Sequence, residues 1–200
     1  MENQDTNASQ NQERKPVKPE EKFGMKDFGK SLLFSIVFVV LFTTLIAKPI
    51  RVNGSSMYPT LVDKELGFSD VLTYKLMGVD RFDVVIVYVD QLKEYLVKRV
   101  IALPGETVEV KDDVLYIDYK PVSQSFLNED YVALMKTQTG QDFTSSFGPL
   151  TVPEGEVWLM GDNRPNSSDS RRFGTFPINK IVSKSALILY PLNRIRIITK

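Results

Sequence analysis

The residues best suited to chemistry lie in the stretch NGSSMYPTL, residues 53–61. It holds two serines between a permissive glycine and a rigid proline, which suits a hydroxyl held for reaction. A serine nucleophile needs a base, and the 200-residue chain contains neither histidine nor cysteine. A Ser-His-Asp triad, a thiol nucleophile and a zinc site of histidine and cysteine are therefore excluded. The base must be a lysine, a carboxylate, a tyrosine or a carboxylate-bound metal.

Lysine is the natural candidate, because Ser-Lys dyads exist. A lysine must be neutral to accept a proton, and burial among apolar groups can lower its pKa by about 3–5 pH units. Lys98 lies in an apolar sequence, where strand alternation places it on the same face as Leu96 and Val100. Its neighbour Arg99 cannot act as a base, because a guanidinium does not deprotonate in a protein. The alternative is that Lys98 faces solvent on an edge strand.

A third polar stretch, GDNRPNSSDSRRFG, covers residues 161–174. Its glycines and proline predict a loop. Its hydroxyls could orient an amine, and its Asp/Arg pairs could hold the loop in place. No metal site is expected, because three arginines compete for the carboxylates. The alternative is an ordinary turn-rich surface loop.

An uncharged apolar run extends from Ser31 to Ala47. As a helix it would be about 26 Å long, slightly short of a ~30 Å hydrocarbon core. Lys30 and Lys48 flank the run and can reach the two interfaces, and Pro49 is expected to stop the helix. A buried soluble helix should show a polar face, and a cleaved signal peptide should be shorter with small residues at its end. An uncleaved membrane anchor fits better than either.

The basic residues around this run predict its orientation. Lysines 15, 18, 22, 26 and 30 precede it, whereas Lys48 and Arg51 follow it, so the N-terminus should be cytoplasmic. We expect a disordered cytoplasmic tail over residues 1–27, a transmembrane anchor over 28–48 and an extracytoplasmic catalytic domain over 49–200 in the cell membrane. The lipid bilayer is thus an expected partner. Nucleic acid is not, because the formal net charge is zero.

The remainder predicts a mainly β fold, because β-branched and aromatic residues recur in short runs. Strands are expected at 81–89, 94–103 and 157–160, with a hairpin of 107–110 and 114–117. The apolar segments 181–190 and 195–199 are too short to span a membrane. Residues 121–150 are polar, resemble a loop and carry no motif.

Together the stretches NGSSMYPTL, YLVKRVIALPGE and GDNRPNSSDSRRFG, in this order after an N-terminal anchor, resemble bacterial type I signal peptidases. The resemblance covers residues 48 to about 176 with gaps, and the single anchor looks more like the Gram-positive members. It implies a signal-peptidase-like β-rich catalytic domain behind one transmembrane helix. It also implies a membrane-bound serine endopeptidase that removes signal peptides from exported preproteins, cuts after small residues and needs no cofactor. The preproteins are its implied partners, and the secretion machinery is a further partner that the resemblance allows.

The resemblance also implies roles for individual positions. Ser56 matches the nucleophile, Lys98 the general base and Ser167 a hydroxyl that orients the lysine amine. Asp169 and Arg171 match an ion pair that supports the site. Three apolar positions match the lining of small pockets for an Ala-x-Ala ending: Met57, Leu61 and Val97.

One position departs from the family pattern. Some members carry a serine two residues before the nucleophile, where its hydroxyl helps to bind the oxyanion; this chain has Gly54. The Ser56 backbone N–H can still donate, and the second donor stays open between another backbone group and Ser55. Two other functions are weighed. A self-cleaving repressor-type Ser/Lys protease would need a DNA-binding domain where the apolar run lies, and a catalytically silent membrane-anchored binding protein would lack Ser56 or Lys98.

Overall fold

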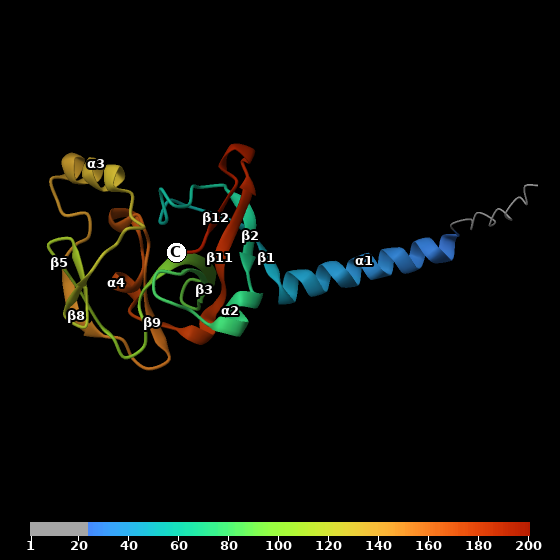
Figure 1. The fold of residues 1–200 in the computed structure, drawn as a ribbon, viewed down its shortest axis with the longest axis horizontal. Coiled ribbons are helices and arrows are strands. Elements are labelled where there is room, and N and C mark those ends of the chain that lie inside the picture. Colours follow the sequence, from blue (N-terminus) through green and yellow to red (C-terminus); the bar gives the residue numbers. More distant parts are fainter. Residues whose placement is uncertain (1–23) are drawn as a thin grey trace, which may run out of the picture. The chain divides into compact units, whose positions relative to one another are not determined.

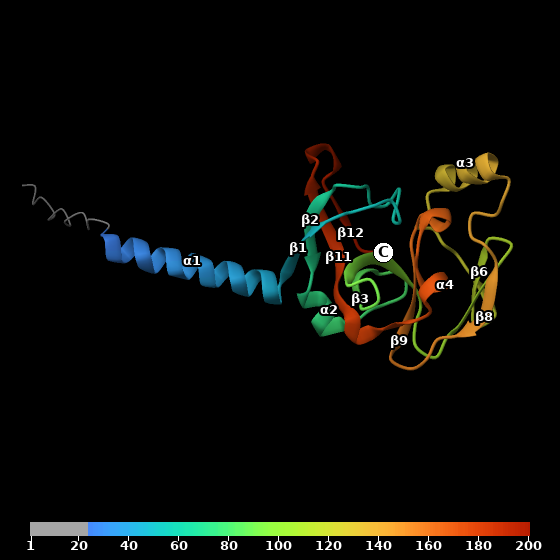
Figure 2. The same cartoon turned by 180° about the vertical axis from the view of Figure 1, so that it is seen from behind.

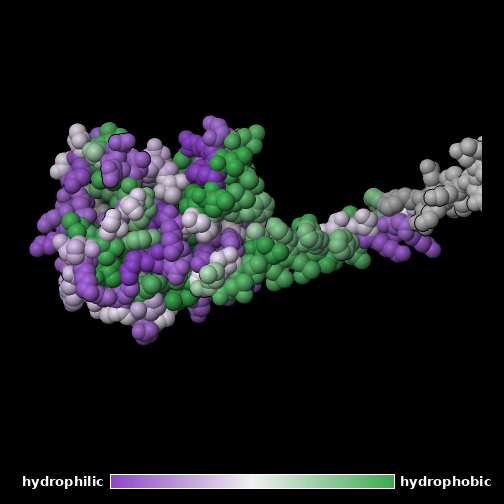
Figure 3. Space-filling model, in the orientation of Figure 1, coloured by the Kyte–Doolittle hydropathy of each residue, from purple (hydrophilic) through white to green (hydrophobic). Residues whose placement is uncertain are grey.

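The computed structural model describes residues 24–200, which form two compact units, one ending at Val37 and the other covering Phe38–Lys200. Helix α1 (Met25–Leu45) contains the predicted apolar run up to Leu45, and none of its residues is buried. It is long and apolar enough to cross a membrane. In Figure 3 its visible face is covered by apolar side chains over most of its length.

Both ends of α1 differ from the prediction. The helix begins at Met25, before the expected span of 28–48, because Gly24 and Asp27 cap it. Asp27 Oδ2 accepts from the Gly24 N–H at 3.2 Å, and the Asp27 N–H donates to the Gly24 carbonyl at 3.0 Å. Residues 25–27 of the expected tail are thus helical, and the rest of that tail, up to residue 23, lies outside the described residues.

The helix ends at Leu45, so the prediction that Pro49 stops it is wrong. The Ile46 carbonyl accepts from the Val71 N–H at 2.9 Å, and the chain enters a strand at Ala47, opposite Asp70. Sheet pairing therefore ends the helix before Pro49 is reached. Pro49 lies in this strand, at the edge of the sheet, where a residue without an N–H is tolerated.

A large antiparallel sheet forms the main body of the second unit (Figure 1). The order of its strands is β1-β2-β11-β3-β4-β9-β10, with β12 paired to β11. Their bounds are β1 (Ala47–Arg51), β2 (Leu66–Asp70), β3 (Val84–Val89), β4 (Glu94–Ala102), β9 (Glu156–Met160), β10 (Phe176–Pro177), β11 (Ile181–Tyr190) and β12 (Arg196–Ile198). The expected strands at 81–89, 94–103 and 157–160 are thus confirmed with small changes of length, whereas β1 and β2 were not predicted.

A smaller sheet has the order β7-β6-β5-β8. Its strands are β5 (Thr107–Lys111), β6 (Val114–Ile117), β7 (Lys120–Val122) and β8 (Phe147–Thr151). The predicted hairpin is β5–β6, whose turn residues Asp112 and Asp113 both have positive φ, as a tight hairpin turn requires. In Figures 1 and 2 this sheet lies at the end of the unit away from β1 and β2.

Three helices and three short 3-10 turns complete the second unit. The helices are α2 (Leu72–Met77), α3 (Glu129–Thr139) and α4 (Ser170–Phe173), and the turns cover Arg164–Asn166, Ile178–Lys180 and Leu192–Arg194. The expectation of a loop over 121–150 is wrong, because α3 and most of β8 lie there. Asn128 caps α3 by accepting from the Tyr131 N–H at 2.8 Å, and Gly140 ends it in a left-handed conformation. No residue of α3 is fully buried, and only Tyr131, Val132 and Met135 are half-buried.

Apolar clusters hold these elements together and place the motif stretches. One lies against the small sheet and includes Trp158 and Met160, whereas another joins the large sheet to the 53–61 stretch through Met57 and Leu61. The loop between β1 and β2 is therefore packed onto the same sheet that carries Lys98.

Candidate active site

Ser56 and Lys98 meet although 42 residues separate them. Ser56 lies in the loop between β1 and β2, and Lys98 lies in the middle of β4. Lys98 Nζ donates to Ser56 Oγ at 2.7 Å, and only 2% of Lys98 is exposed. Burial lowers the pKa of Lys98 to about 8; nearby Asp169 opposes this effect, and Arg171 adds to it. A substantial fraction of the amine is therefore neutral near pH 8, as a base requires.

The neighbouring Arg99 has a different surrounding. Its guanidinium forms a bidentate pair with Asp162, with Nε–Oδ1 at 2.8 Å and Nη2–Oδ2 at 2.7 Å, and both residues are 1% exposed. Asp162 Oδ2 also accepts from the Thr60 hydroxyl at 2.6 Å. Arg99 and Thr60 thus use the Asp162 carboxylate, and Lys98 keeps a hydroxyl as its hydrogen-bond partner. Because Thr60 lies in the Ser56 loop, the same network ties that loop to β4.

Asp169 and Arg171 form the predicted ion pair, with Nη2–Oδ2 at 2.7 Å and Nε–Oδ1 at 2.9 Å. Asp169 is fully buried and also accepts from the Gly161 N–H at 3.0 Å. Burial raises the pKa of Asp169, but hydrogen bonding to Arg171 and the charge of Arg171 outweigh burial and lower it overall. The pair keeps a charged carboxylate at the base of the 161–174 loop.

Ser167 lies beside the nucleophile, although its predicted contact with the lysine is not formed. A Cβ atom on Gly161 would lie 2.3 Å from both Ser167 Oγ and the Ser56 carbonyl oxygen, so Gly161 separates these two residues without room for a side chain. The Ser167 hydroxyl is buried, and hydrogen bonding from it helps to lower the pKa of the neighbouring Asp169. Its role in orienting the Lys98 amine stays a prediction.

The three candidate oxyanion groups differ in whether they have a hydrogen-bond donor that is not already used. Gly54 adopts φ +88°, and its N–H donates to Asp63 Oδ1 at 2.8 Å. The Ser55 side chain is exposed. The Ser56 N–H takes part in no hydrogen bond formed by the described residues. Of the two N–H groups, that of Ser56 is thus the one available to a ligand.

Only one of the three predicted pocket residues lines a groove. Val97 belongs to a groove of about 670 Å³ whose apolar residues are Ile50, Ile86, Tyr95, Leu96, Val97 and Val182. Met57 and Leu61 are buried in the core, at 2% and 0% exposure, and pack with Val97 beneath this surface. They can shape the groove through Val97 but do not line it in this structure.

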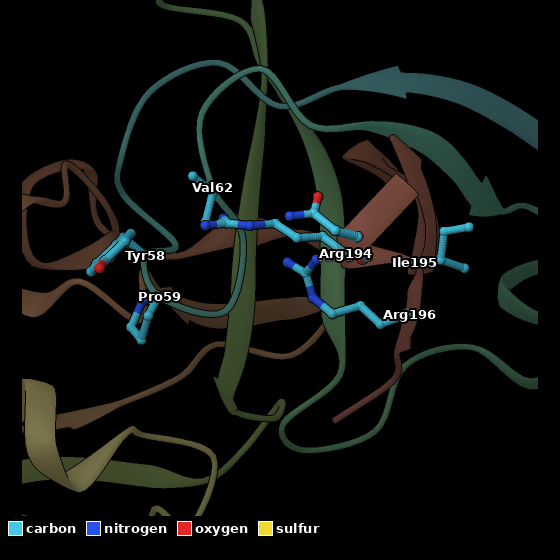
Figure 4. Close-up of a pocket in the computed structure, with 7 residues that line it drawn as sticks. Tyr58, Pro59, Val62, Arg194, Ile195 and Arg196 are labelled. Carbon is cyan, nitrogen blue, oxygen red and sulfur yellow. Dashed lines mark hydrogen bonds between the residues drawn. The ribbon is translucent and has the colours of Figure 1, made fainter. Parts of the chain in front are cut away.

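A second hollow, of about 410 Å³, lies beside the other end of the Ser56 loop (Figure 4). Its lining includes Tyr58, Val62 and two arginines, of which Arg196 is committed to structural contacts. Arg196 pairs with buried Glu65 and donates to the Thr60 carbonyl at 2.7 Å. Neither Ser56 nor Lys98 lines this hollow or the groove that contains Val97, and the groove is preferred because Val97 directly precedes Lys98 on β4. In residues 24–200, no group of three or more acidic residues is arranged to hold a metal ion.

Several supporting residues were not assigned from the sequence. Arg99, Asp162, Asn163 and Thr60 lie inside the quoted motifs, but their partners are about 60 to 110 residues away. Asn163 donates from its main-chain N–H to the Ser56 carbonyl and from Nδ2 to the Ser55 carbonyl, each at 3.0 Å. Tyr131 of α3 donates to Asn163 Oδ1 at 3.1 Å. No sequence signal pointed to Tyr131.

Comparison with known proteins identifies the family of this chain. The family described as "Signal peptidase, peptidase S26" matches residues 25–190. "Signal peptidase I S" of Bacillus subtilis is 39% identical over 182 residues, covering 88% of this chain and 95% of the relative. "Signal peptidase I" of Bacillus amyloliquefaciens is 38% identical over 171 residues, covering 85% and 88%. A crystal structure of a signal peptidase I from Enterococcus faecalis is 37% identical, with a TM-score of 0.46, and covers 53% of this chain and 95% of that one. The chain therefore belongs to the type I signal peptidases, peptidase family S26.

Proposed function

We propose that this protein removes N-terminal signal peptides from exported preproteins with Ser56 as nucleophile and Lys98 as general base. The observation that carries the proposal is the 2.7 Å hydrogen bond between Lys98 Nζ and Ser56 Oγ, made by a lysine that is almost fully buried. Burial lowers the pKa of Lys98 to about 8, so that a neutral amine is available. A base with a pKa near the working pH is the most effective.

The reaction follows from this contact. Neutral Lys98 takes the Ser56 hydroxyl proton as Oγ attacks the carbonyl carbon after a small residue. The resulting ammonium gives its proton to the leaving amine of the mature protein, and an acyl-enzyme remains. Lys98, again neutral, removes a proton from the water that attacks the ester, and then returns a proton to Ser56 Oγ. The signal peptide leaves as a carboxylate.

The Ser56 N–H is the first oxyanion donor in this proposal, because the described residues leave it without an acceptor. The Ser55 hydroxyl is the second candidate, since it is exposed and adjacent. The Gly54 N–H is occupied by Asp63. Removing an oxyanion donor typically raises the barrier by about 3–4 kcal/mol. Because such donors act only when they already point at the oxyanion, the backbone that carries the Ser56 N–H must be held in place.

We infer that the substrate binds as an extended segment along β4. β9 pairs with β4 only between Arg99 and Ala102, so the preceding residues Glu94–Lys98 have a free edge on that side. An extended peptide can add to such an edge through main-chain hydrogen bonds. The groove containing Val97 adjoins this edge and offers apolar surface for small side chains. Met57 and Leu61 would support the groove from below.

The protein is membrane-anchored, and we propose that α1 is a single anchor with a cytoplasmic N-terminus and that the catalytic domain is extracytoplasmic. The lysines that precede the helix favour this orientation. The end of the β11–β12 hairpin exposes large apolar residues, among them Leu192 at 76% and Ile197 at 72%. Such a surface fits contact with the bilayer in which the signal peptides also lie. Enzyme and substrate in one membrane reach a high effective concentration, and the secretion machinery would deliver the preproteins there.

The dyad is tested by assaying Ser56→Ala and Lys98→Met separately on a purified preprotein, with mass spectrometry of the cut site. Each should lose at least about 10³-fold in kcat/KM. Lys98→Arg should fail equally, because a guanidinium is not a base. The exposed Ser123→Ala and Lys120→Met on the small sheet are matched controls and should cleave normally. Substantial cleavage by Ser56→Ala or Lys98→Met would reject the dyad.

The anchor is tested by alkaline carbonate extraction of membranes. Retention in the pellet supports α1 as an integral anchor. A soluble product would remove the membrane part of the proposal and reopen the self-cleaving repressor-type alternative.

A further inference from the structure

We propose that Tyr131 is a positioning residue for the cleavage reaction: through Asn163, its hydroxyl fixes the backbone that carries the Ser56 N–H. This inference rests on the proposed function. It concerns helix α3, which lies in the segment that carries no sequence motif. Two successive hydrogen bonds, Tyr131 to Asn163 and Asn163 to Ser55, link that helix to the nucleophile loop.

The link runs through a single buried amide. Tyr131 Oη donates to Asn163 Oδ1 at 3.1 Å, and Asn163 Nδ2 donates to the Ser55 carbonyl at 3.0 Å. The Asn163 main-chain N–H donates to the next carbonyl, that of Ser56, also at 3.0 Å. Asn163 is 2% exposed, so water does not replace these partners easily. Asn163 thus contacts both carbonyls of the Ser55-Ser56 pair, and the Ser55 carbonyl also accepts from the Tyr58 N–H at 3.0 Å.

Holding the Ser55 carbonyl also aims the Ser56 N–H. The two groups belong to one planar trans peptide unit, in which C=O and N–H point in opposite directions. Rotation of this unit would move both groups together. The hydrogen bond from Asn163 Nδ2, together with that from the Tyr58 N–H to the same carbonyl at 3.0 Å, therefore sets the direction of the proposed oxyanion donor.

The Ser55 carbonyl can only accept, so it requires Asn163 Nδ2 on its side, and the Tyr131 hydroxyl helps to hold the Asn163 amide in that orientation. A turned amide would direct Oδ1 at the Ser55 carbonyl, and two acceptors would then face each other. Two donors oppose this arrangement by holding Oδ1 on the other side: the Tyr131 hydroxyl at 3.1 Å and Asn166 Nδ2 at 3.4 Å. The Tyr131 contact is the shorter, so its loss should loosen the amide most.

Tyr131 is itself held firmly. The Asn128 cap fixes its backbone at the start of α3. Its ring meets Tyr58 edge-on, with centroids 4.9 Å apart, and Phe143 at 6.0 Å. Burial, and next the proximity of Tyr58, raise the pKa of Tyr131. The hydroxyl thus remains a proton donor over the pH range in which Lys98 becomes neutral.

The test is Tyr131→Phe, which keeps the ring and removes only the hydroxyl. On a preprotein, kcat should fall about tenfold with little change in KM, because the loss acts on the transition state. Tyr74→Phe is the matched control. It also removes a part-buried hydrogen bond from a tyrosine hydroxyl, here to the Ile178 carbonyl at 2.9 Å, but outside the site. It should retain the wild-type kcat.

A pair of peptide probes separates positioning from general loosening. Lys98 takes the Ser56 hydroxyl proton as Oγ bonds to the carbon of a peptide aldehyde ending in alaninal; the C=O π pair moves onto the former carbonyl oxygen, which takes the oxyanion position. Tyr131→Phe should weaken this probe about tenfold. The matching peptide ending in alaninol, which has no carbonyl oxygen, should bind unchanged. Equal weakening of both probes would overturn the proposal in favour of a general structural role.

A double-mutant cycle tests the route through Asn163. If Tyr131 acts only through that amide, Tyr131→Phe should have no further effect in an Asn163→Ala background. An undiminished tenfold effect there, or a Tyr131→Phe enzyme as fast as wild type, would overturn the inference. Failure of the proposed function is distinguishable, because it would appear as cleavage by Ser56→Ala or Lys98→Met.

Discussion

Two lysines lie opposite Val85 on the strands at either side of β3, and they have different surroundings. Lys98 of β4 and Lys184 of β11 both pair in register with Val85, and they are 2% and 6% exposed. Lys184 Nζ meets the buried carboxylate of Asp83 at 3.1 Å. Lys98 Nζ meets the Ser56 hydroxyl instead.

The partner, and not the depth of burial, separates these two lysines. A buried ammonium next to a carboxylate is compensated, and such a pair holds strands together. A buried ammonium next to a hydroxyl is not compensated, so burial can lower the pKa of Lys98 to about 8. The same sheet therefore contains one lysine suited to structure and one suited to proton transfer.

The largest expected effects come from replacing each lysine by methionine, and they differ between Lys98 and Lys184 in both cleavage and stability. Lys98→Met should abolish cleavage, by at least about 10³-fold, yet leave the free energy of unfolding at pH 7 unchanged or raise it by up to about 3 kcal/mol, because a poorly compensated buried charge is removed. Lys184→Met should lower the free energy of unfolding by about 3–5 kcal/mol, because Asp83 is left buried without its partner. Denaturant unfolding and cleavage per folded molecule measure both effects.

A companion variant makes this prediction specific. Asp83→Asn combined with Lys184→Met removes both charges and should recover part of the lost stability. If Lys98→Met destabilised the protein as much as Lys184→Met does, the distinction between the two lysines would be wrong.

The pH dependence of cleavage should follow Lys98. Because only the neutral amine accepts a proton and its pKa is about 8, kcat/KM should fall about tenfold per pH unit well below 8 and level off above it. The sign follows from the lysine: raising the pH removes its proton and increases activity. A profile whose rising limb has its midpoint near 10, as for an exposed lysine, would contradict the role of burial.

A smaller effect is expected from Arg171→Gln. The charge of Arg171 lowers the pKa of Lys98, whereas the charge of its partner Asp169 raises it. Without the guanidinium, its direct lowering of the pKa of Lys98 is lost, and the negative charge of Asp169 is no longer neutralised by a partner. Both effects move the pKa of Lys98 upward. The variant's kcat/KM relative to wild type should be about two- to threefold lower at pH 7 than at pH 10. The pH profile of the variant, whose acid limb should move to higher pH, measures this difference. A downward displacement would show that Arg171 acts on the site by another route.

The same two lysines show how far the sequence could predict the site. Lys98 was singled out because an apolar strand and a missing histidine required a buried base. Lys184 also lies in an apolar strand, and only its partner Asp83, 101 residues away, distinguishes the two. Local pattern therefore predicts a buried lysine, whereas its chemical role depends on contacts that only the folded chain defines.

The fold was predictable to the same degree. Strands with dense β-branched residues were predicted best: β4 is one residue shorter than expected, and β3 begins three residues later than expected. β1 was missed because it begins at the end of the apolar run and contains Pro49, and α3 was missed because none of its residues is fully buried. The supporting contacts of Thr60, Asn163 and Tyr131 all join distant segments, so no short-range pattern revealed them.

The alternation of Lys98 and Arg99 along β4 makes the enzyme sensitive to chain length. Lys98 contacts the nucleophile, and the next residue contacts Asp162. Loss of one residue from the strand before Lys98 would bring a permanent cation to Ser56 and direct the only base away from it, even if the sheet formed normally. A change of two residues would keep Lys98 on the same face but displace it by about 7 Å along the strand, too far for its hydrogen bond to Ser56. Both odd and even changes of length within this strand should thus abolish cleavage, the first by turning the base away and the second by moving it out of reach.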